Sequence, residues 1–382
     1  MERALQLEIA RLLQATLEVS DPTECKERRE LEVPAHHYTS EEHLAIERAR
    51  LFRACPVLAA HSQHLPEPGD SMTHDATGLP VILVRGKDGV VRGFVNACRH
   101  RATRLLDCDA PCQRKAFVCR YHGWTYDQQG ALVHVPHQSA FPTLDTGARG
   151  LLPVPVAEAH GFIWLLADPG ADLDLAGYLG PVGAELDSFG MAEHTLYRES
   201  ARECACNWKL VMDAFLEGYH VRHLHRSSVY PFFYDSRGAA QSVGQHIRTA
   251  SARRLLGDAD LDDPTLVVRS LVSFTHFVFP NTVFIYHPDY ISRLSVYPLA
   301  ADRTRFEHTM LIPEAPTNDK AARHWTRSFD LIQDSVFEAE DLAVCVAMQR
   351  GLASGVTGPL LFGALEHPAQ WFHHTLAEYG AG

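Results

Sequence analysis

The feature that most limits what this chain can fold into is a repeated pairing of Cys with His. One residue separates Cys98 from His100, and two residues separate Cys119 from His122. Each pair follows a short run of β-branched and aromatic residues, which is typical of a strand that ends in a loop. The pattern predicts that two such loops meet in a small β domain and offer two thiolates and two imidazoles to a metal centre.

Two kinds of centre suit these four ligands. In a [2Fe-2S] cluster the thiolates can hold one iron and the imidazoles the other, which raises the potential above that of an all-Cys cluster. Zinc is the alternative, because two Cys and two His also satisfy a tetrahedral site, and Cys108 and Cys112 lie between the pairs. No Cys-x-x-Cys pair occurs here, and we therefore favour the cluster.

A second polar group lies in an apolar stretch, about residues 207–226, that we expect to be helical. Asp213, Glu217 and His220 are spaced i, i+4 and i+7, which places them on one helical face. His220 and His225 are about 140° apart on an ideal helix. Both can reach one metal only if the helix ends or bulges between them. Two histidines and a carboxylate on ferrous iron would leave positions open for O2.

Other interpretations of this group remain. These side chains can be satisfied core or surface groups, as most single histidines are. The Glu217-x-x-His220 spacing also suits a di-iron carboxylate bundle, but we find no second Glu-x-x-His suitably placed. The third ligand must come from this helix or from elsewhere in the chain.

The first group resembles the Rieske cluster domain, whose motif is Cys-x-His followed by Cys-x-x-His. Arg101 after the first pair, and Tyr121, Gly123 and Trp124 around the second, match the form in bacterial Rieske oxygenases. The resemblance implies that the cluster ligands are Cys98, His100, Cys119 and His122. Since that branch has no disulfide beside the cluster, we expect Cys108 and Cys112 to be ordinary loop residues.

The second group resembles the iron-binding helix of the ring-hydroxylating oxygenase α subunit. The resemblance implies that His220 and His225 bind a mononuclear iron, and that Glu217 links His220 to a cluster histidine of a neighbouring subunit. Most of that family has Asp at the position of Glu217, whereas Glu occurs in a branch that includes oxygenases of quaternary amines. Asn207 and Asp213 join Glu217 as candidate catalytic residues.

The family pattern of an acidic pair followed by Gln-x-Gly assigns the third iron ligand to Asp341. Gln349 and Gly351 supply the second part of that pattern. Glu338 and Glu340 compete with Asp341, and the acidic run by itself could be a solvated helix face.

We predict three segments in this chain. Residues 1–55 should form helices that pack on the catalytic domain, residues 56–167 a small all-β [2Fe-2S] domain, and residues 168–382 a larger catalytic domain. Strand-like runs at 272–278 and 291–297, with a helix over about 318–352, predict an α+β arrangement with an antiparallel sheet. The resemblance implies a helix-grip-like fold for that domain.

The function that the resemblance implies is the oxygenase component of a multicomponent Rieske oxygenase, a monooxygenase or dioxygenase. It would use O2 to hydroxylate or oxidatively dealkylate a small organic substrate, either an aromatic compound or a quaternary or tertiary amine. The sequence has no Gly-x-Gly-x-x-Gly motif, so electrons must come from a separate NAD(P)H reductase, with or without a ferredoxin. The family forms homotrimers. A Rieske electron-transfer protein without oxygenase activity is the alternative.

Composition narrows the possible partners. The formal charge is −12, with 35 basic and 47 acidic residues and no basic run, which argues against nucleic acid. The charged N-terminal segment has no apolar signal region and the apolar runs are short, so we expect a cytoplasmic protein that does not enter a membrane. Aromatic side chains between residues 230 and 297 can line a substrate site or be plain core: Phe232, Phe233, Tyr234, Phe274, Phe277 and Tyr286.

Overall fold

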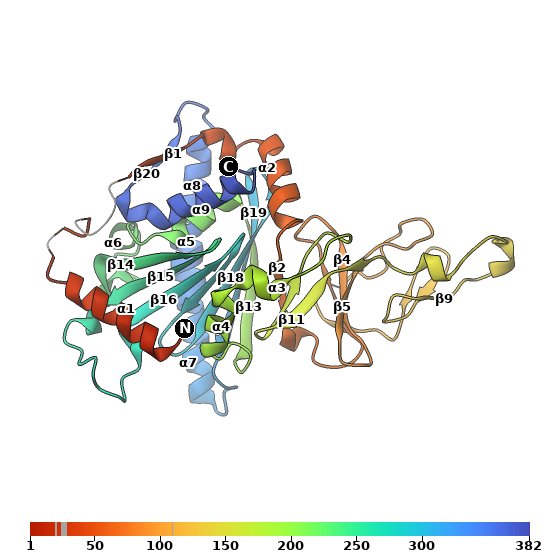
Figure 1. Ribbon diagram of the computed structural model, residues 1–382, viewed down its shortest axis with the longest axis horizontal. Helices are drawn as coiled ribbons and strands as arrows, with labels where there is room; N and C mark the ends of the chain where they lie inside the picture. The colour runs from red at the N-terminus through yellow and green to blue at the C-terminus, as the bar shows by residue number, and fades with distance from the viewer. Residues whose placement is uncertain (20, 24–28, 109) are drawn as a thin grey trace. The chain divides into compact units, whose positions relative to one another are not determined.

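The computed structural model describes residues 1–19, 21–23, 29–108 and 110–382, and Cys25 lies outside them. The chain divides into two compact units (Figure 1). One unit is Arg48–Tyr178, and the other combines Met1–Glu47 with Leu179–Gly382. No helix among the described residues is long and apolar enough to cross a membrane.

The smaller unit consists of short antiparallel strands in three sheets. Asp127 and Gly130 close the turn between β8 and β9, where Gly130 has φ +83° and donates its N–H to the Asp127 carbonyl. The sheets have the strand orders β10-β5-β4-β3-β6, β11-β12-β2 and β7-β8-β9. The strands are β2 (Val57–His61), β3 (Asp70–His74), β4 (Val81–Arg85), β5 (Val91–Val95), β6 (Cys112–Gln113), β7 (Phe117–Val118), β8 (Thr125–Tyr126), β9 (Leu132–His134), β10 (Pro153–Val154), β11 (Val156–Ala159) and β12 (Phe162–Leu165).

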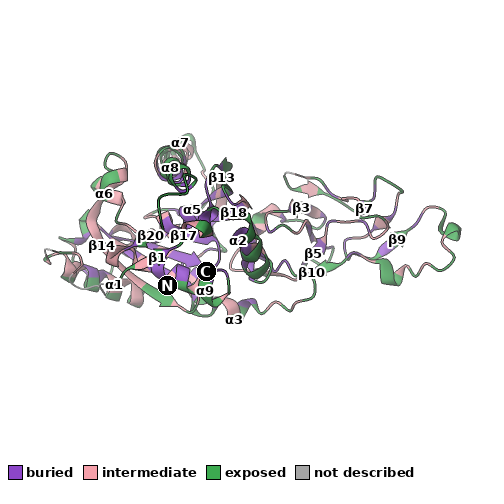
Figure 2. Ribbon diagram, turned by 90° about the horizontal axis from the view of Figure 1, so that it is seen from above, coloured by how far each residue is buried: buried purple, intermediate pink, exposed green. Residues whose placement is uncertain are grey.

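The larger unit is built on one seven-stranded antiparallel sheet with the order β13-β19-β18-β17-β16-β15-β14. The expected strand at 272–278 is present with those bounds, and the one at 291–297 extends to Ala300. β18 is buried over its first eight residues and is purple in Figure 2. The strands are β13 (Thr195–Cys204), β14 (Phe233–Val243), β15 (His246–Arg253), β16 (Val272–Val278), β17 (Thr282–Tyr286), β18 (Ile291–Ala300) and β19 (Arg303–Ile312).

Helices pack against this sheet. The predicted helix over 318–352 is continuous in the structure, but its middle third, η9, is a π-helix rather than an α-helix. α1 contacts β14 and β15 (Figure 1). The helices are α1 (Arg3–Thr16), α2 (Glu41–Glu47), α4 (Pro181–Ser188), α5 (Trp208–Leu216), α6 (Val221–Leu224), α7 (Asp319–Asp330), η9 (Leu331–Leu342), α8 (Ala343–Leu352) and α9 (His367–Glu378), with α3 (Leu175–Leu179) and the π-turn η2 (Arg48–Phe52) at the boundary between the units.

The first 55 residues are less helical than the sequence suggests. α1, α2 and η2 are helical, but β1 (Leu31–Val33) pairs antiparallel with β20 (Leu360–Phe362). A three-residue strand has no periodicity to detect, and its partner is more than 300 residues away in the chain.

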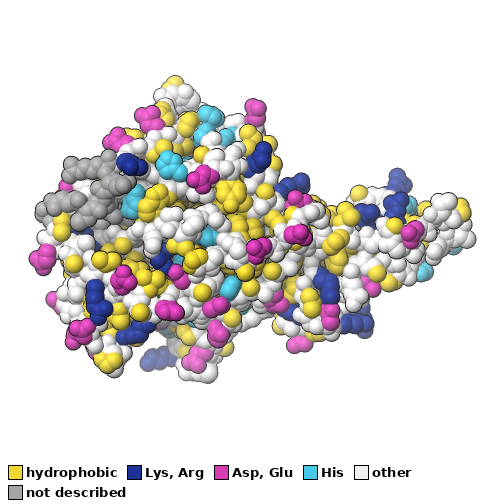
Figure 3. Space-filling view, in the orientation of Figure 1, with side chains coloured by type: hydrophobic (Ala, Val, Ile, Leu, Met, Phe, Trp, Pro, Cys, Tyr) yellow, Lys and Arg dark blue, Asp and Glu magenta, His cyan; other side chains and the backbone are white. Residues whose placement is uncertain are grey.

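Charged side chains of both signs are interspersed on the face of the molecule shown in Figure 3. That face therefore has no extended basic stripe of the type that binds a phosphate backbone.

Candidate metal centres and the adjoining cavity

The two Cys-His loops of the smaller unit have the same backbone hydrogen bonds. The Cys98 carbonyl accepts from Ala102 N and the Cys119 carbonyl from Gly123 N, both at 2.8 Å. Cys98 N and Cys119 N donate to Thr103 and Trp124 carbonyls, again at 2.8 Å. Ala102 and Gly123 both have positive φ, at 58° and 72°. The loops are therefore two copies of one turn.

The side chains of the two loops meet. The His100 and His122 ring centroids are 4.7 Å apart, and Cys98 and Cys119 interact through their thiols. Both cysteines are 3% exposed, whereas His122 is exposed and His100 half-buried. Burial raises the pKa of Cys98, although hydrogen bonds from the Tyr126 hydroxyl and the His100 backbone act to lower it. Sulfurs that face inward, accept hydrogen bonds and lie beside two outer imidazoles suit a mixed Cys/His cluster.

The expectation for Cys108 and Cys112 is wrong. The structure joins them in a disulfide with a Cα–Cα distance of 6.7 Å. Three residues separate them, and the resemblance to a branch without this disulfide gave no reason to pair them. The remaining described cysteines are free, including both candidate cluster ligands.

The helix that carries the second polar group ends earlier than predicted. α5 ends at Leu216, Glu217 is extended with φ −134° and ψ 165°, and α6 is one turn from Val221 to Leu224. The break therefore precedes His220 rather than falling between His220 and His225. Since Glu217 has left the helix, the expected shared face of Asp213, Glu217 and His220 does not exist.

His220 and His225 flank α6 and converge on Asp341 of η9. Asp341 Oδ1 lies 3.1 Å from His225 Nε2 and 3.7 Å from His220 Nε2. One donor atom from each of these residues lies within 4.8 Å of the other two. Asp341 and His225 are buried, and His220 is half-buried. Three ligand atoms at one point, two imidazoles and a carboxylate, match the facial triad of non-haem iron sites.

A carboxylate also holds the far nitrogen of each imidazole. Glu217 Oε1 hydrogen-bonds His220 Nδ1, and Glu340 Oε2 lies 2.7 Å from His225 Nδ1. This fixes the Nδ1–H tautomer and leaves the Nε2 lone pair for a metal. Burial would lower the pKa of His225, but Asp341 and Glu340 raise it overall. The donor set thus fits an iron, and Glu340 contacts Nδ1 of His225, on the far side of the ring from the converging Nε2 atoms.

Asn207 and Asp213, the other two candidate catalytic residues, make contacts within the larger unit. Asn207 caps α5, because its Oδ1 accepts from Lys209 N at 3.0 Å and its Nδ2 donates to the Ala301 carbonyl. Asp213 is buried and accepts from the Tyr38 hydroxyl and His373 Nε2, both at 2.9 Å. Neither residue is among the described residues that line the cavity below. Their contacts give them positions that hold helices together.

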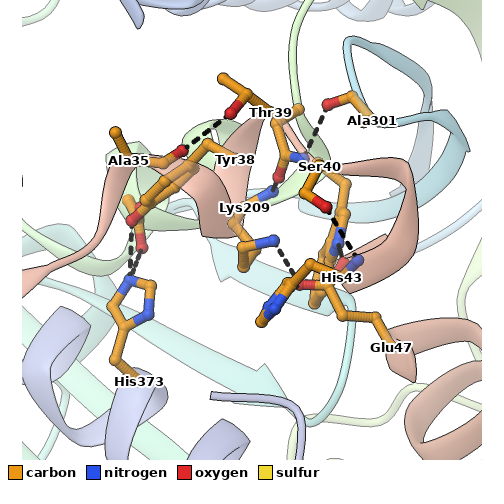
Figure 4. A network of polar contacts seen from close by, with 12 residues as sticks. Ala35, Tyr38, Thr39, Ser40, His43, Glu47, Lys209, Ala301 and His373 are labelled. Atoms are coloured by element: carbon orange, nitrogen blue, oxygen red, sulfur yellow. Dashed lines mark hydrogen bonds and ion pairs between the residues drawn. The ribbon is translucent and has the colours of Figure 1, made fainter. Parts of the chain in front are cut away.

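Figure 4 shows the buried network around Tyr38. Lys209 forms an ion pair with Glu47, and both side chains are at most 1% exposed. Trp208 Nε1 donates to the same carboxylate at 2.7 Å. These contacts attach α5 to α2, whereas Tyr38 and Asp213 attach it to α9.

A second histidine group, His36, His37 and His43, also has ligand atoms within 4.8 Å of one another. The His37 and His43 rings are stacked, with centroids 4.3 Å apart and planes 13° apart. A nitrogen lone pair lies in the plane of its ring, so parallel stacked rings direct their lone pairs side by side rather than at one ion. This group is therefore a poorer metal site than the one at Asp341.

A cavity of about 430 Å³ adjoins the facial triad, and His220, His225 and Asp341 line it. β15 and β16 contribute the polar residues Thr249, Ser251, Arg253, Ser273 and Thr275, and α5 and η9 contribute apolar residues such as Phe215, Val336 and Phe337. Of the aromatic candidates, Phe232, Phe233 and Tyr234 line the cavity. Phe274, Phe277 and Tyr286 are at most 1% exposed and belong to the core.

Residues 191–382 match the family model of the ring-hydroxylating α subunit catalytic domain, and residues 55–146 match the Rieske [2Fe-2S] domain. The chain belongs to the ring-hydroxylating oxygenase α-subunit family. It is the oxygenase component of a Rieske-type oxygenase, with a Rieske [2Fe-2S] cluster and a mononuclear iron as cofactors. Such subunits receive electrons from a reductase partner and act on small molecules.

Relatives include enzymes of two substrate types. The chain is 26% identical to the carnitine monooxygenase oxygenase subunit of Acinetobacter baumannii, over 91% of this chain and 94% of that protein. It is 38% identical to the chlorobenzene dioxygenase α subunit of a Cupriavidus species, over 48% of this chain and 42% of that subunit.

Solved structures share the fold. The quaternary ammonium Rieske monooxygenase CntA with L-carnitine matches with a TM-score of 0.78 and 22% identity, over 94% of this chain and 97% of that one. Naphthalene 1,2-dioxygenase with indole matches with a TM-score of 0.75 and 20% identity, over 92% of each chain. The α+β fold with an antiparallel sheet is thus confirmed.

Proposed function

We propose that this oxygenase oxidises its substrate in the 430 Å³ cavity beside an iron held by His220, His225 and Asp341. The convergence of these three side chains on the cavity wall is the observation that carries the proposal. The reaction is hydroxylation or oxidative dealkylation of a small organic compound, an aromatic molecule or a quaternary or tertiary amine. We assign the cluster to Cys98, His100, Cys119 and His122.

When bound, the iron supplies the activation of O2. The protein's own residues orient the site. Glu217 and Glu340 keep both imidazoles in the tautomer that presents Nε2. Phe215, Val336 and Phe337 give one side of the cavity an apolar wall, which keeps water away from a bound substrate.

We further propose that Glu217 connects His220 to a cluster histidine of an adjacent subunit in a head-to-tail homotrimer. Glu217 Oε1 is on His220, and Oε2 accepts from the Tyr219 and His220 amides, which holds the carboxylate rigidly. The exposed edge of His122 is the part of the cluster site that a neighbouring subunit can reach. A heterologous interface of this kind closes into a ring.

The experiment that tests the function is a substrate screen on anaerobically reconstituted protein with a surrogate reductase. Aromatic compounds and quaternary amines are compared, and product is scored against O2 consumed. We expect one mole of chelatable iron beyond the cluster, and O2 uptake that depends on substrate. A variant with both His220 and His225 replaced by Ala that still coupled O2 uptake to product would refute the site, and a protein that only transferred electrons would refute the oxygenase reaction.

A further inference from the structure

We propose that the cavity selects substrates that carry an anionic group, a carboxylate or a similar oxyanion, and that Arg253 binds this group. This inference names the substrate class of the site described above and so rests on the proposed function. Such a cavity would bind small organic acids and zwitterions in preference to neutral hydrocarbons and simple cationic amines.

Arg253 lies in a position from which it can bind a substrate in the cavity. It is the last residue of β15, and its side chain lines the same cavity as His220, His225 and Asp341. Its Nη1 donates to the Ser273 hydroxyl at 3.2 Å. The guanidinium carbon lies 5.1 Å from the ring centroid of Phe233 and 5.9 Å from that of Phe232. Two rings and a hydroxyl therefore hold a planar cation against the cavity.

The charge of Arg253 is poorly compensated by the protein. Among the described residues, no carboxylate lies within 4.0 Å of it, and Asp289, the acidic residue whose field reaches it, is paired with His324 at 2.8 Å. Burial lowers the pKa of Arg253 below its usual value, in spite of the opposing influence of Tyr290 and Asp289. A half-buried guanidinium without an ion pair gains more from a bound carboxylate than a solvated one does.

The surroundings of Arg253 suit an oxyanion. Ser251 lies two residues earlier on β15 and directly opposite Ser273 of β16, and both line the cavity. Thr249 and Thr275 form the next such pair along the same two strands. Hydroxyl groups can donate to the oxygen of a carboxylate that the guanidinium leaves unbound.

The cavity lining carries charges of both signs, and its carboxylates already have partners: Asp289 also lines the cavity but is paired with His324 at 2.8 Å. Glu217 and Asp341 belong to the metal end, where they contact histidines. Arg237 also lines the cavity, but its guanidinium donates to the Val19 carbonyl. A substrate with an anionic end and an oxidisable carbon would be oriented by the contact of its anionic end with Arg253.

The same contacts argue against a cation bound at these aromatic rings. Phe232 and Phe233 already stack with Arg253, and a quaternary ammonium placed there would meet a like charge. An amine substrate is compatible with this site when it also carries a carboxylate that Arg253 can bind.

The test measures binding rather than turnover. Isothermal titration calorimetry on anaerobic holoenzyme compares benzoate with benzamide, and hexanoate with hexanamide. We expect at least one carboxylate to bind about 10-fold or more tightly than its amide, since a hydrogen bond to a charged group is stronger than one to a neutral group. Arg253→Gln should abolish this preference, and Arg253→Lys should keep part of it because the charge remains but the bidentate fork is lost.

Arg254→Gln is the matched control. Arg254 is exposed, stacks with Tyr230 and Tyr234, and is not among the described residues lining the cavity, so its loss should leave the preference unchanged. Cluster absorbance and the content of chelatable iron verify that both units of each variant are folded and loaded. The inference is overturned if neither acid binds better than its amide, if Arg253→Gln keeps the preference, or if Arg237→Gln or Arg254→Gln removes it equally.

The two proposals can fail separately. Loss of the anion preference alongside productive O2 uptake with neutral substrates refutes the role of Arg253 alone. An intact preference without any substrate-dependent O2 uptake refutes the oxygenase site alone.

Discussion

A carboxylate holds each histidine of the triad, and the two carboxylates differ in their environment. Glu217 lies in the break between α5 and α6 and is 11% exposed. Glu340 lies on η9, contacts His225 and accepts from the Ser228 hydroxyl at 2.6 Å. Glu340 therefore supports one ligand from within the chain, whereas Glu217 is the one that we propose to meet another subunit.

Replacing Glu217 with Gln should preserve both metals and remove most turnover, by about 10- to 100-fold for a residue that supports a metal ligand. Gln can still occupy the space but has lost the charge that favours Nδ1–H of His220. Iron content, cluster absorbance and product formation are measured together. Glu338→Gln is the control, because Glu338 is 50% exposed and pairs with Arg202 away from the histidines. Full activity in Glu217→Gln would remove its assignment as the bridge.

The Glu47–Lys209 pair should govern acid stability of the larger unit. Burial would raise the pKa of Glu47, but the charge of Lys209 and hydrogen bonds from His43, Lys209 and Trp208 lower it below 4.5. A carboxyl whose pKa is lowered by folding stabilises the protein above its unfolded pKa, and this contribution is lost as pH falls through the lowered value. Glu47→Gln should therefore weaken the pH dependence of stability in the acid range.

At neutral pH the same substitution should cost about 3–5 kcal/mol, because it leaves Lys209 buried without a counter-charge. Urea unfolding near pH 7 and below pH 4.5 measures both effects. Asp262→Asn serves for comparison, since Asp262 is 87% exposed and its pair with Arg11 lies on the surface. Equal stability of Glu47→Gln and the native protein at neutral pH would contradict this account.

At the scale of elements, the two ends of α5 position the site. Asn207 begins the helix with a side-chain cap, and the chain leaves helical geometry at Glu217 so that His220 can turn toward Asp341. On the opposite side, η9 brings Glu340 and Asp341, adjacent in the chain, to the two nitrogens of the His225 ring. π-helical segments occur frequently at functional sites.

Asn207→Ala should lower stability and spare chemistry. Loss of the cap costs about 1–2 kcal/mol, and the buried Ala301 carbonyl also loses its donor. We expect a lower urea midpoint together with a near-native rate per loaded iron. Asn207→Asp keeps the capping oxygen and should recover part of the stability. A loss of rate in fully loaded, folded Asn207→Ala would restore the catalytic role that the sequence suggested.

At the scale of the whole molecule, the proposed trimer predicts that two inactive variants regain activity when they assemble together. One variant has Ala at His100 and His122 and lacks a functional cluster, and the other has Ala at His220 and His225 and lacks the iron. If electrons cross between neighbouring subunits, mixed trimers regain activity, because one of the three interfaces in each mixed ring pairs an intact donor with an intact acceptor, giving about a third of native activity.

Co-expression with two affinity tags yields the mixed assemblies, and sedimentation gives their subunit number. Separately purified variants combined without subunit exchange are the control. Mixed assemblies as inactive as the single variants would show that electrons stay within one chain, and a monomer in sedimentation would exclude the trimer.

The sequence alone determined the family and two strands of the seven-stranded sheet, because those features are local. The doubled Cys-His motif is read within 25 residues, and Val272–Val278 shows its strand propensity in its own residues. The sequence did not show which residues come into contact once the chain is folded. The disulfide between Cys108 and Cys112, the pairing of β1 with β20, and the end of α5 at Leu216 all required the folded chain.

Tertiary structure also decided among residues of the same type. Glu338, Glu340 and Asp341 are close in sequence, yet one pairs with a surface arginine, one holds His225 Nδ1, and one faces both Nε2 atoms. Asp213 accepts hydrogen bonds from Tyr38 and His373, while Arg253, which the sequence analysis did not single out, lines the cavity. A carboxylate or guanidinium has the same chemistry anywhere in the chain, and only its neighbours in space determine its role.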